Sequence, residues 1–99
     1  MNKAFVERFE AILEALDALA EACPDDAAED LEDLNAELED ALMLLGELKA
    51  DEADEQAGAL EDIRALAEDY RALAANVPAL SDCADRLALA ADLALNNRS

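Results

Sequence analysis

Apolar side chains recur at alternating intervals of four and three residues along most of this chain. In the first segment the series consists of Phe5, Phe9, Ile12, Leu16, Leu19 and Cys23. This spacing places apolar side chains on one face of an α-helix, turn after turn. Similar series recur in three later segments, so the chain is predicted to be all-α.

Two prolines mark places where helices should end. The residue before a proline is disfavoured in the helical conformation, so one helix is predicted to end at Cys23-Pro24 and another at Val77-Pro78. Pro24 itself suits the first turn of the following helix, where its missing N–H needs no partner. The predicted helices cover about residues 3–22, 24–50, 52–76 and, from 78 or 81, to 96.

The boundary between the second and third helices has no glycine-rich turn. After Leu48 the apolar series would next reach Glu52 and Glu55, whose charges are too costly to bury in a core. The second helix should therefore end near Ala50, and Asp51 is predicted as the N-cap of the third. A helix continuing through Ala50 and Asp51 would leave a long three-helix arrangement instead.

Four amphipathic helices with short links are typical of an antiparallel, up-down-up-down four-helix bundle. We expect a single helical domain over residues 1–99. The side chains expected in its core include Phe9, Leu16, Leu38, Leu45, Ile63 and Tyr70. The Tyr70 hydroxyl is expected at the edge of that core.

The two cysteines, Cys23 and Cys83, should lie at the same end of neighbouring helices in this topology. They are either a thiol pair, with a redox or metal-binding role, or two small apolar side chains of the core. A cytoplasmic protein would keep both thiols reduced.

The absence of histidine excludes several kinds of site. Zinc–histidine sites, Glu-x-x-His di-iron sites and Ser-His or Cys-His nucleophile pairs all need this residue. The acidic segments do not have the spacing of a calcium-binding loop, and no glycine-rich phosphate loop occurs. We therefore expect no cofactor, no dedicated metal site and no enzymatic activity.

No segment has the pattern of a targeting signal or a membrane span. Glu7, Arg8 and Glu10 interrupt any apolar signal-peptide region near the start. The run from Ala41 to Leu45 is far shorter than the roughly 20 apolar residues that a spanning helix needs. A cytoplasmic location without membrane contact is the expectation.

The net charge of -19 is unevenly distributed along the chain. Residues 1–23 carry -3, residues 24–50 carry -9, residues 51–77 carry -6 and residues 78–99 only -1. In the third helix, Arg64 and Arg71 are spaced to pair with Glu61 and Glu68 at i,i+3. The second helix has no such compensation, since no Lys or Arg occurs between residues 8 and 49.

The outward side of the second helix is the candidate partner-binding face. Its acidic residues are Asp25, Asp26, Glu29, Asp30, Glu32, Asp33, Glu39, Asp40 and Glu47. Residues 25–40 contain nine carboxylates, or one per roughly 2.7 Å of helix, compared with about 1.7 Å per phosphate in duplex DNA. Such a face would suit a basic groove built for DNA or RNA, whereas direct nucleic-acid binding is disfavoured.

In charge and size the chain resembles small DNA-mimic inhibitors, including anti-restriction and anti-CRISPR proteins encoded by phages and mobile elements. The resemblance implies a non-enzymatic inhibitor whose partner is a protein with a basic, nucleic-acid-binding surface. Two simpler roles for the acids remain open, namely solubility and adaptation to high salt. The nearly neutral last 22 residues argue against salt adaptation, which should acidify every surface.

A different class of function is also open: a small helical assembly or scaffold protein whose acids serve only solubility. Four apolar residues lie off the main seams, namely Met43, Leu44, Leu89 and Leu95. They either widen the core or form an interface with a partner or with a second copy in a homodimer.

Overall fold

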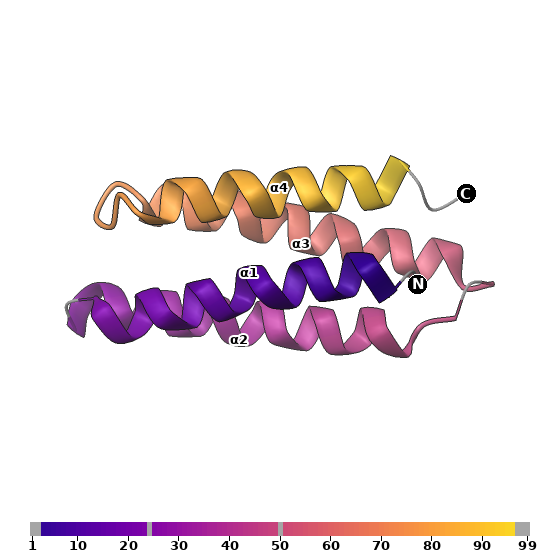
Figure 1. Cartoon of the computed structure of the whole chain (residues 1–99), viewed down its shortest axis with the longest axis horizontal. Coiled ribbons are helices and arrows are strands. Elements are labelled where there is room, and N and C mark those ends of the chain that lie inside the picture. Colours follow the sequence, from indigo (N-terminus) through magenta and orange to yellow (C-terminus); the bar gives the residue numbers. More distant parts are fainter. Residues whose placement is uncertain (1–2, 24, 50, 97–99) are drawn as a thin grey trace.

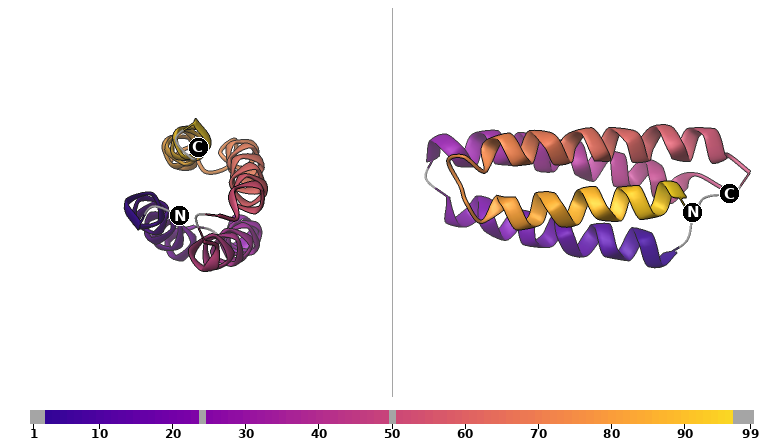
Figure 2. Two further views of the ribbon diagram at one scale, coloured as in Figure 1. Left: turned by 90° about the vertical axis from the view of Figure 1, so that its right-hand side faces the viewer. Right: turned by 90° about the horizontal axis from the view of Figure 1, so that it is seen from above.

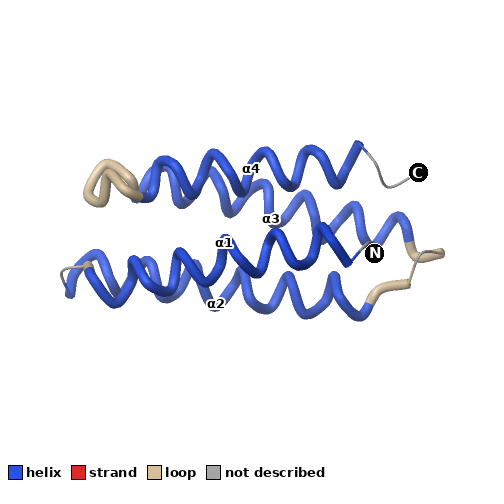
Figure 3. Tube along the Cα trace, in the orientation of Figure 1, coloured by secondary structure: helices blue, strands red, loops and turns tan. Residues whose placement is uncertain are grey.

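The chain forms four α-helices in the computed structural model, which describes residues 3–23, 25–49 and 51–96 apart from the side chain of Asp25. They are α1 (Lys3–Ala22), α2 (Asp25–Glu47), α3 (Ala53–Leu73) and α4 (Leu80–Asn96). Consecutive helices pack antiparallel, and α4 returns beside α1 (Figure 1). The described residues include no strand (Figure 3). The predicted antiparallel four-helix bundle is confirmed.

The link between α2 and α3 decides the number of helices. Residues 48 and 49 are already non-helical, so the predicted break is confirmed and the three-helix arrangement is excluded. The predicted N-cap at Asp51 is wrong, because the N–H of Glu52 donates to the Lys49 carbonyl in a tight turn that contains Asp51. Glu52 is the N-cap residue, without a side-chain capping bond. Buried Gln56 holds the link by donating a 2.6 Å hydrogen bond to the same Lys49 carbonyl.

The third helix ends earlier than predicted. α3 stops at Leu73, and the chain then tightens into turns in which the N–H of Asn76 donates to the Leu73 carbonyl at 2.9 Å. Such i,i+3 bonds are common where a helix ends. α4 begins at Leu80, after Pro78, within the predicted range. The predicted place of Pro24 in the first turn of α2 falls outside the described residues.

The core receives large apolar side chains from every helix. Those with essentially no exposed surface are Phe9, Leu16, Leu31, Leu38, Leu45, Leu60, Ile63, Tyr70, Leu80 and Leu87. All six of the predicted core residues are among them, so that prediction is confirmed. Burying each leucine or isoleucine favours folding by about 1.5 to 3 kcal/mol.

The inner face of α2 includes one polar residue. The apolar series of this helix contains Leu34, Ala41 and Leu42, of which Leu42 is buried and the other two are only half-buried. Asn35, which is 4% exposed, occupies a core position instead. The inner series is therefore Leu31, Asn35, Leu38, Leu42 and Leu45, which keeps the alternation of four and three but admits one polar residue.

Asn35 belongs to a polar chain that joins three helices. It accepts a 2.7 Å hydrogen bond from the Tyr70 hydroxyl of α3 and donates one of 3.1 Å to Oδ1 of Asp17 on α1. The prediction that the Tyr70 hydroxyl lies at the edge of the core is wrong, since this hydrogen bond is buried. Burial, together with the charges of Asp17 and Glu37, raises the pKa of Tyr70, so the hydroxyl remains a donor.

Candidate functional site

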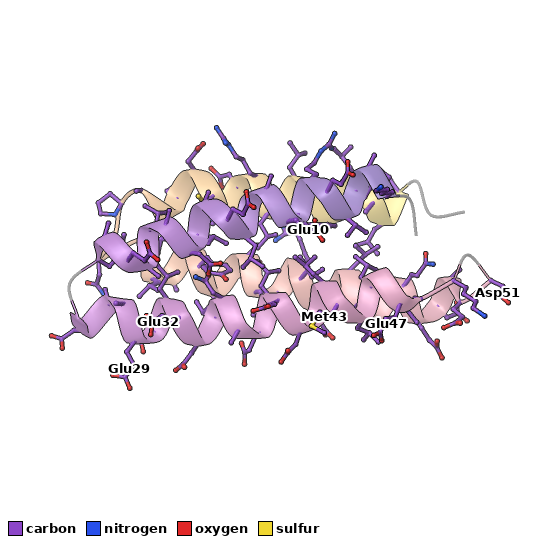
Figure 4. All side chains as sticks on the ribbon, turned by 60° about the horizontal axis from the view of Figure 1, so that its bottom comes forward. Glu10, Glu29, Glu32, Met43, Glu47 and Asp51 are labelled. Carbon is purple, nitrogen blue, oxygen red and sulfur yellow. The ribbon has the colours of Figure 1, made fainter. Side chains whose placement is uncertain are left out.

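The carboxylates of α2 cover its solvent-facing side. Those whose side chains are described are all exposed, namely Asp26, Glu29, Asp30, Glu32, Asp33, Glu37, Glu39, Asp40 and Glu47. Figure 4 shows Glu29 and Glu32 projecting near one end of α2 and Glu47 near the other. The side chain of Asp25, part of the predicted face, lies outside the described residues.

A furrow between α2 and α3 gathers acids from both helices. It consists of adjoining hollows of about 430 and 450 Å³, which share Glu37 and Asp69, and a third hollow of about 390 Å³ at the start of α2. The acids that line them, called the acidic groove below, are Asp26, Asp30, Asp33, Glu37, Asp40, Asp62 and Asp69.

The spacing of these acids gives the groove a regular charge pattern. From Asp26 to Asp40 the five acids of α2 follow the 4-3-4-3 alternation of a single helical ridge. The ridge is about 21 Å long at 1.5 Å per residue. With Asp62 and Asp69 opposite, the groove holds roughly one carboxylate per 3 Å, close to the 3.4 Å per phosphate of one DNA strand.

The described carboxylates of α2 form no ion pair with a neighbouring cation. Within the described ranges, every ion pair lies on α1, α3 or α4. Arg64 and Arg71 of α3 reach across to Asp92 and Asp85 of α4, so they do not serve the acidic groove. The predicted i,i+3 pairing of these arginines is replaced by these contacts and by a 3.9 Å approach of Arg64 to Glu68.

Three groove residues were missing from the predicted face: Glu37, Asp62 and Asp69. The sequence does indicate that two of these acids lie together. Asp62 and Asp69 directly precede the core residues Ile63 and Tyr70, so they share one side of α3. Recognising that this side meets α2 requires the packing order of the helices. Among the predicted acids, Glu29, Glu32, Glu39 and Glu47 are exposed on α2 outside the acidic groove.

The predicted apolar residues do not form one surface. Met43 and Leu44 are exposed on α2, and Leu89 is exposed on α4, which lies diagonally across the bundle (Figure 2). Leu95 is half-buried and packs against the core. Leu93, which was not among the predicted interface residues, is 37% exposed on α4.

Both cysteines are free thiols that pack, half-buried, against the core. The end of α1 and the start of α4 lie at the same end of the bundle, as the topology predicted (Figure 1). Burial, and secondarily the charge of Asp82, raise the pKa of the Cys83 thiol. A protonated thiol is a poor nucleophile and metal ligand, so this environment favours a packing role for Cys83.

In the described part of the chain, no group of three or more Cys, Asp or Glu side chains is arranged so that it could hold a metal ion. None of its helices combines the length and the apolar character needed to cross a membrane. Comparisons with protein-family models, curated proteins and solved structures give no match for this chain.

Proposed function

We propose that this protein inhibits a nucleic-acid-binding protein by occupying its basic groove. The observation that supports this proposal is the acidic groove, in which two helices present seven carboxylates at nearly the spacing of phosphates along one strand. Binding would release counterions from the partner's basic groove and from the carboxylates, as nucleic acid does.

The cost of the groove to folding supports a role beyond solubility. Asp26 with Asp30, and Asp33 with Glu37, are like-charge neighbours at i,i+4, and each such pair destabilises a helix by about 0.2 to 0.5 kcal/mol. Their exposed positions would accept lysine as readily as aspartate, and a mixed surface would serve solubility without this repulsion. Concentrated repulsion on one side of the bundle is what a charge mimic requires.

The core beneath the groove fixes the spacing of its two walls. The hydrogen bond from Tyr70 to Asn35 connects α3 to α2, the helices that carry the carboxylates. A partner would therefore meet a preformed charge pattern and would lose less conformational entropy on binding than with flexible acidic tails.

A charge-reversal experiment tests the proposal. The groove variant carries Asp33→Lys, Glu37→Lys and Asp69→Lys, and the matched control carries Glu10→Lys, Glu14→Lys and Glu21→Lys on α1. Both variants shift the net charge by the same amount, and all six positions are exposed. Immobilised wild type and control should capture a nucleic-acid-binding protein from host lysate, whereas the groove variant should not.

Competition identifies what the groove imitates. Duplex DNA or structured RNA should displace the captured protein, and affinity should fall about 10³-fold or more between about 50 and 200 mM salt. Capture that survives groove reversal, or that nucleic acid does not displace, would contradict the proposal.

Assembly is the second candidate function, favoured by the exposed Leu89 and Leu93 of α4. Apolar assembly should persist at salt concentrations that dissociate an electrostatic complex.

A further inference from the structure

The side of the bundle opposite the acidic groove carries an apolar groove in place of an acidic one. An apolar groove of about 370 Å³ runs between α1 and α4. Its lining includes Ala11 and Ala15 of α1 and the exposed Leu89 and Leu93 of α4. Leu89 is 60% exposed, which is costly for a large apolar side chain unless another surface covers it.

The lining of this groove also lacks the acidic residues that are abundant elsewhere. The residues of α1 that line the groove are Arg8, Ala11, Ile12 and Ala15, and none is a carboxylate. On α4 the bordering Asp82 pairs with Arg86 at 3.1 Å. The guanidinium of Arg8 lies 5.9 Å from the centroid of the Phe5 ring. The lining of the groove therefore holds two arginines, Arg8 and Arg86, and no carboxylate, on a chain of net charge -19.

We propose that this α1/α4 face binds a second copy of the chain and forms a two-fold symmetric dimer. The charge distribution selects this occupant. Two chains of net charge -19 can approach closely only where each has few carboxylates, and the lining of the α1/α4 groove meets that condition. A basic partner, by contrast, would be drawn to α2 and α3.

The geometry keeps the two acidic surfaces apart. In the end-on view α1 and α4 occupy one side of the bundle and α2 and α3 the other (Figure 2). Contact between two α1/α4 faces would therefore leave both acidic grooves on the outside of the dimer, at maximal separation. The dimer does not depend on the proposed inhibitor function, and it would leave both grooves free.

The long side of the bundle sets the upper limit on the area of such a dimer. The bundle measures 43 × 20 × 19 Å, so contact must extend beyond the groove along most of one long side to bury the roughly 800 Å² per partner of a standard interface. Small alanine side chains on α1 let a second helix approach closely, while Leu89 and Leu93 supply the apolar contact. Isologous pairing through one patch also gives a closed assembly and not an open filament.

Sedimentation velocity over a range of protein and salt concentrations tests the dimer. The apolar-groove variant is Leu89→Gln with Leu93→Gln, and the matched control is Met43→Gln with Leu44→Gln on α2. Neither changes the net charge, and Leu89 and Met43 are equally exposed at 60%. Wild type and control should dimerise. The apolar-groove variant should dimerise at least tenfold more weakly, with unchanged helical circular dichroism.

Salt should strengthen this dimer, because screening reduces the repulsion between the two acidic chains. This is opposite to the salt dependence expected for the acidic groove, so either proposal can fail without the other. Ala15→Gln, with exposed Ala36→Gln of α2 as its control, gives a second test that removes no core contact. A wild type that stays monomeric, or a dimer that is broken by the α2 controls and not by the groove variants, would overturn the inference.

Discussion

The Tyr70 hydroxyl donates a 2.7 Å hydrogen bond to Oδ1 of Asn35 inside the core, joining α3 to α2. Asn35 in turn donates to Asp17 of α1, so a single polar chain links three of the four helices. Cores built from leucine and alanine repeats can shift by a heptad at little cost, and a buried polar residue penalises such shifts. We infer that the hydrogen bonds from Tyr70 to Asn35 and from Asn35 to Asp17 help to set the register of α2 against α3.

Removal of the Tyr70 hydroxyl should be costly. Tyr70→Phe leaves the buried carbonyl oxygen of Asn35 without its donor, so the free energy of unfolding should fall by about 1 to 3 kcal/mol. The double variant Tyr70→Phe with Asn35→Leu should recover much of this loss, because the unpaired carbonyl oxygen of Asn35 is then removed as well. Urea denaturation measures both values. An unchanged unfolding free energy in Tyr70→Phe would show that the hydrogen bond contributes nothing.

Tyr70 should resist ionisation in the native state. Burial, with the charges of Asp17 and Glu37, raises its pKa above the usual value of about 10. The unfolded chain releases this proton near pH 10 while the native chain holds it, so stability is complete below pH 10 and is lost as pH rises further. Tyr70 is the only tyrosine, and there is no tryptophan, so phenolate absorbance reports on it alone. A native titration midpoint near pH 10 would contradict this prediction.

Replacement of the helical glycine Gly58 should stabilise the protein. Gly58 lies within α3, and a Cβ added there would meet no atom within 4 Å. Gly58→Ala should raise the free energy of unfolding by about 0.5 to 1 kcal/mol, because alanine restricts the unfolded chain and favours the helix. Gly46→Ala, next to the last residue of α2, should have a smaller effect because helix ends fray. Chemical denaturation measures the free energy of unfolding of both variants. A lower value for Gly58→Ala than for wild type would refute this prediction.

Glu52 should make stability decrease as pH rises. A hydrogen bond with the Glu55 side chain is the main cause that raises the pKa of Glu52, and the charges of Glu55 and Asp51 add to it. The native state therefore binds this proton more tightly than the unfolded chain, so this contribution is present at low pH and is lost as pH rises through the native pKa.

The variant Glu52→Gln should remove this contribution and be at least as stable as wild type at neutral pH. Thermal unfolding between about pH 4 and 7 measures the effect. Glu61→Gln, at an exposed position of α3, controls for the loss of one negative charge. An identical pH dependence in wild type and Glu52→Gln would contradict the assignment.

Helix identity and most of the core followed from local sequence. The alternation of four and three is a property of neighbouring residues, and it predicted α1 over Lys3–Ala22 together with the burial of Phe9 and Leu16. The ends of α3 were less predictable, because its last turn tightens into i,i+3 bonds before Pro78. Asn35 could not be placed from hydrophobicity, since its burial depends on a tyrosine 35 residues away.

The sequence by itself determined that the chain is helical, that it is strongly acidic and that α2 has no compensating cations. Tertiary structure decided which acids lie together. Asp62 and Asp69 join Glu37 in one groove because α3 packs beside α2, while Arg64 and Arg71 turn instead to α4. It also placed Leu89 on the side away from the acids. Local periodicity specifies which face of each helix is buried, but the order in which the helices pack specifies which exposed faces adjoin.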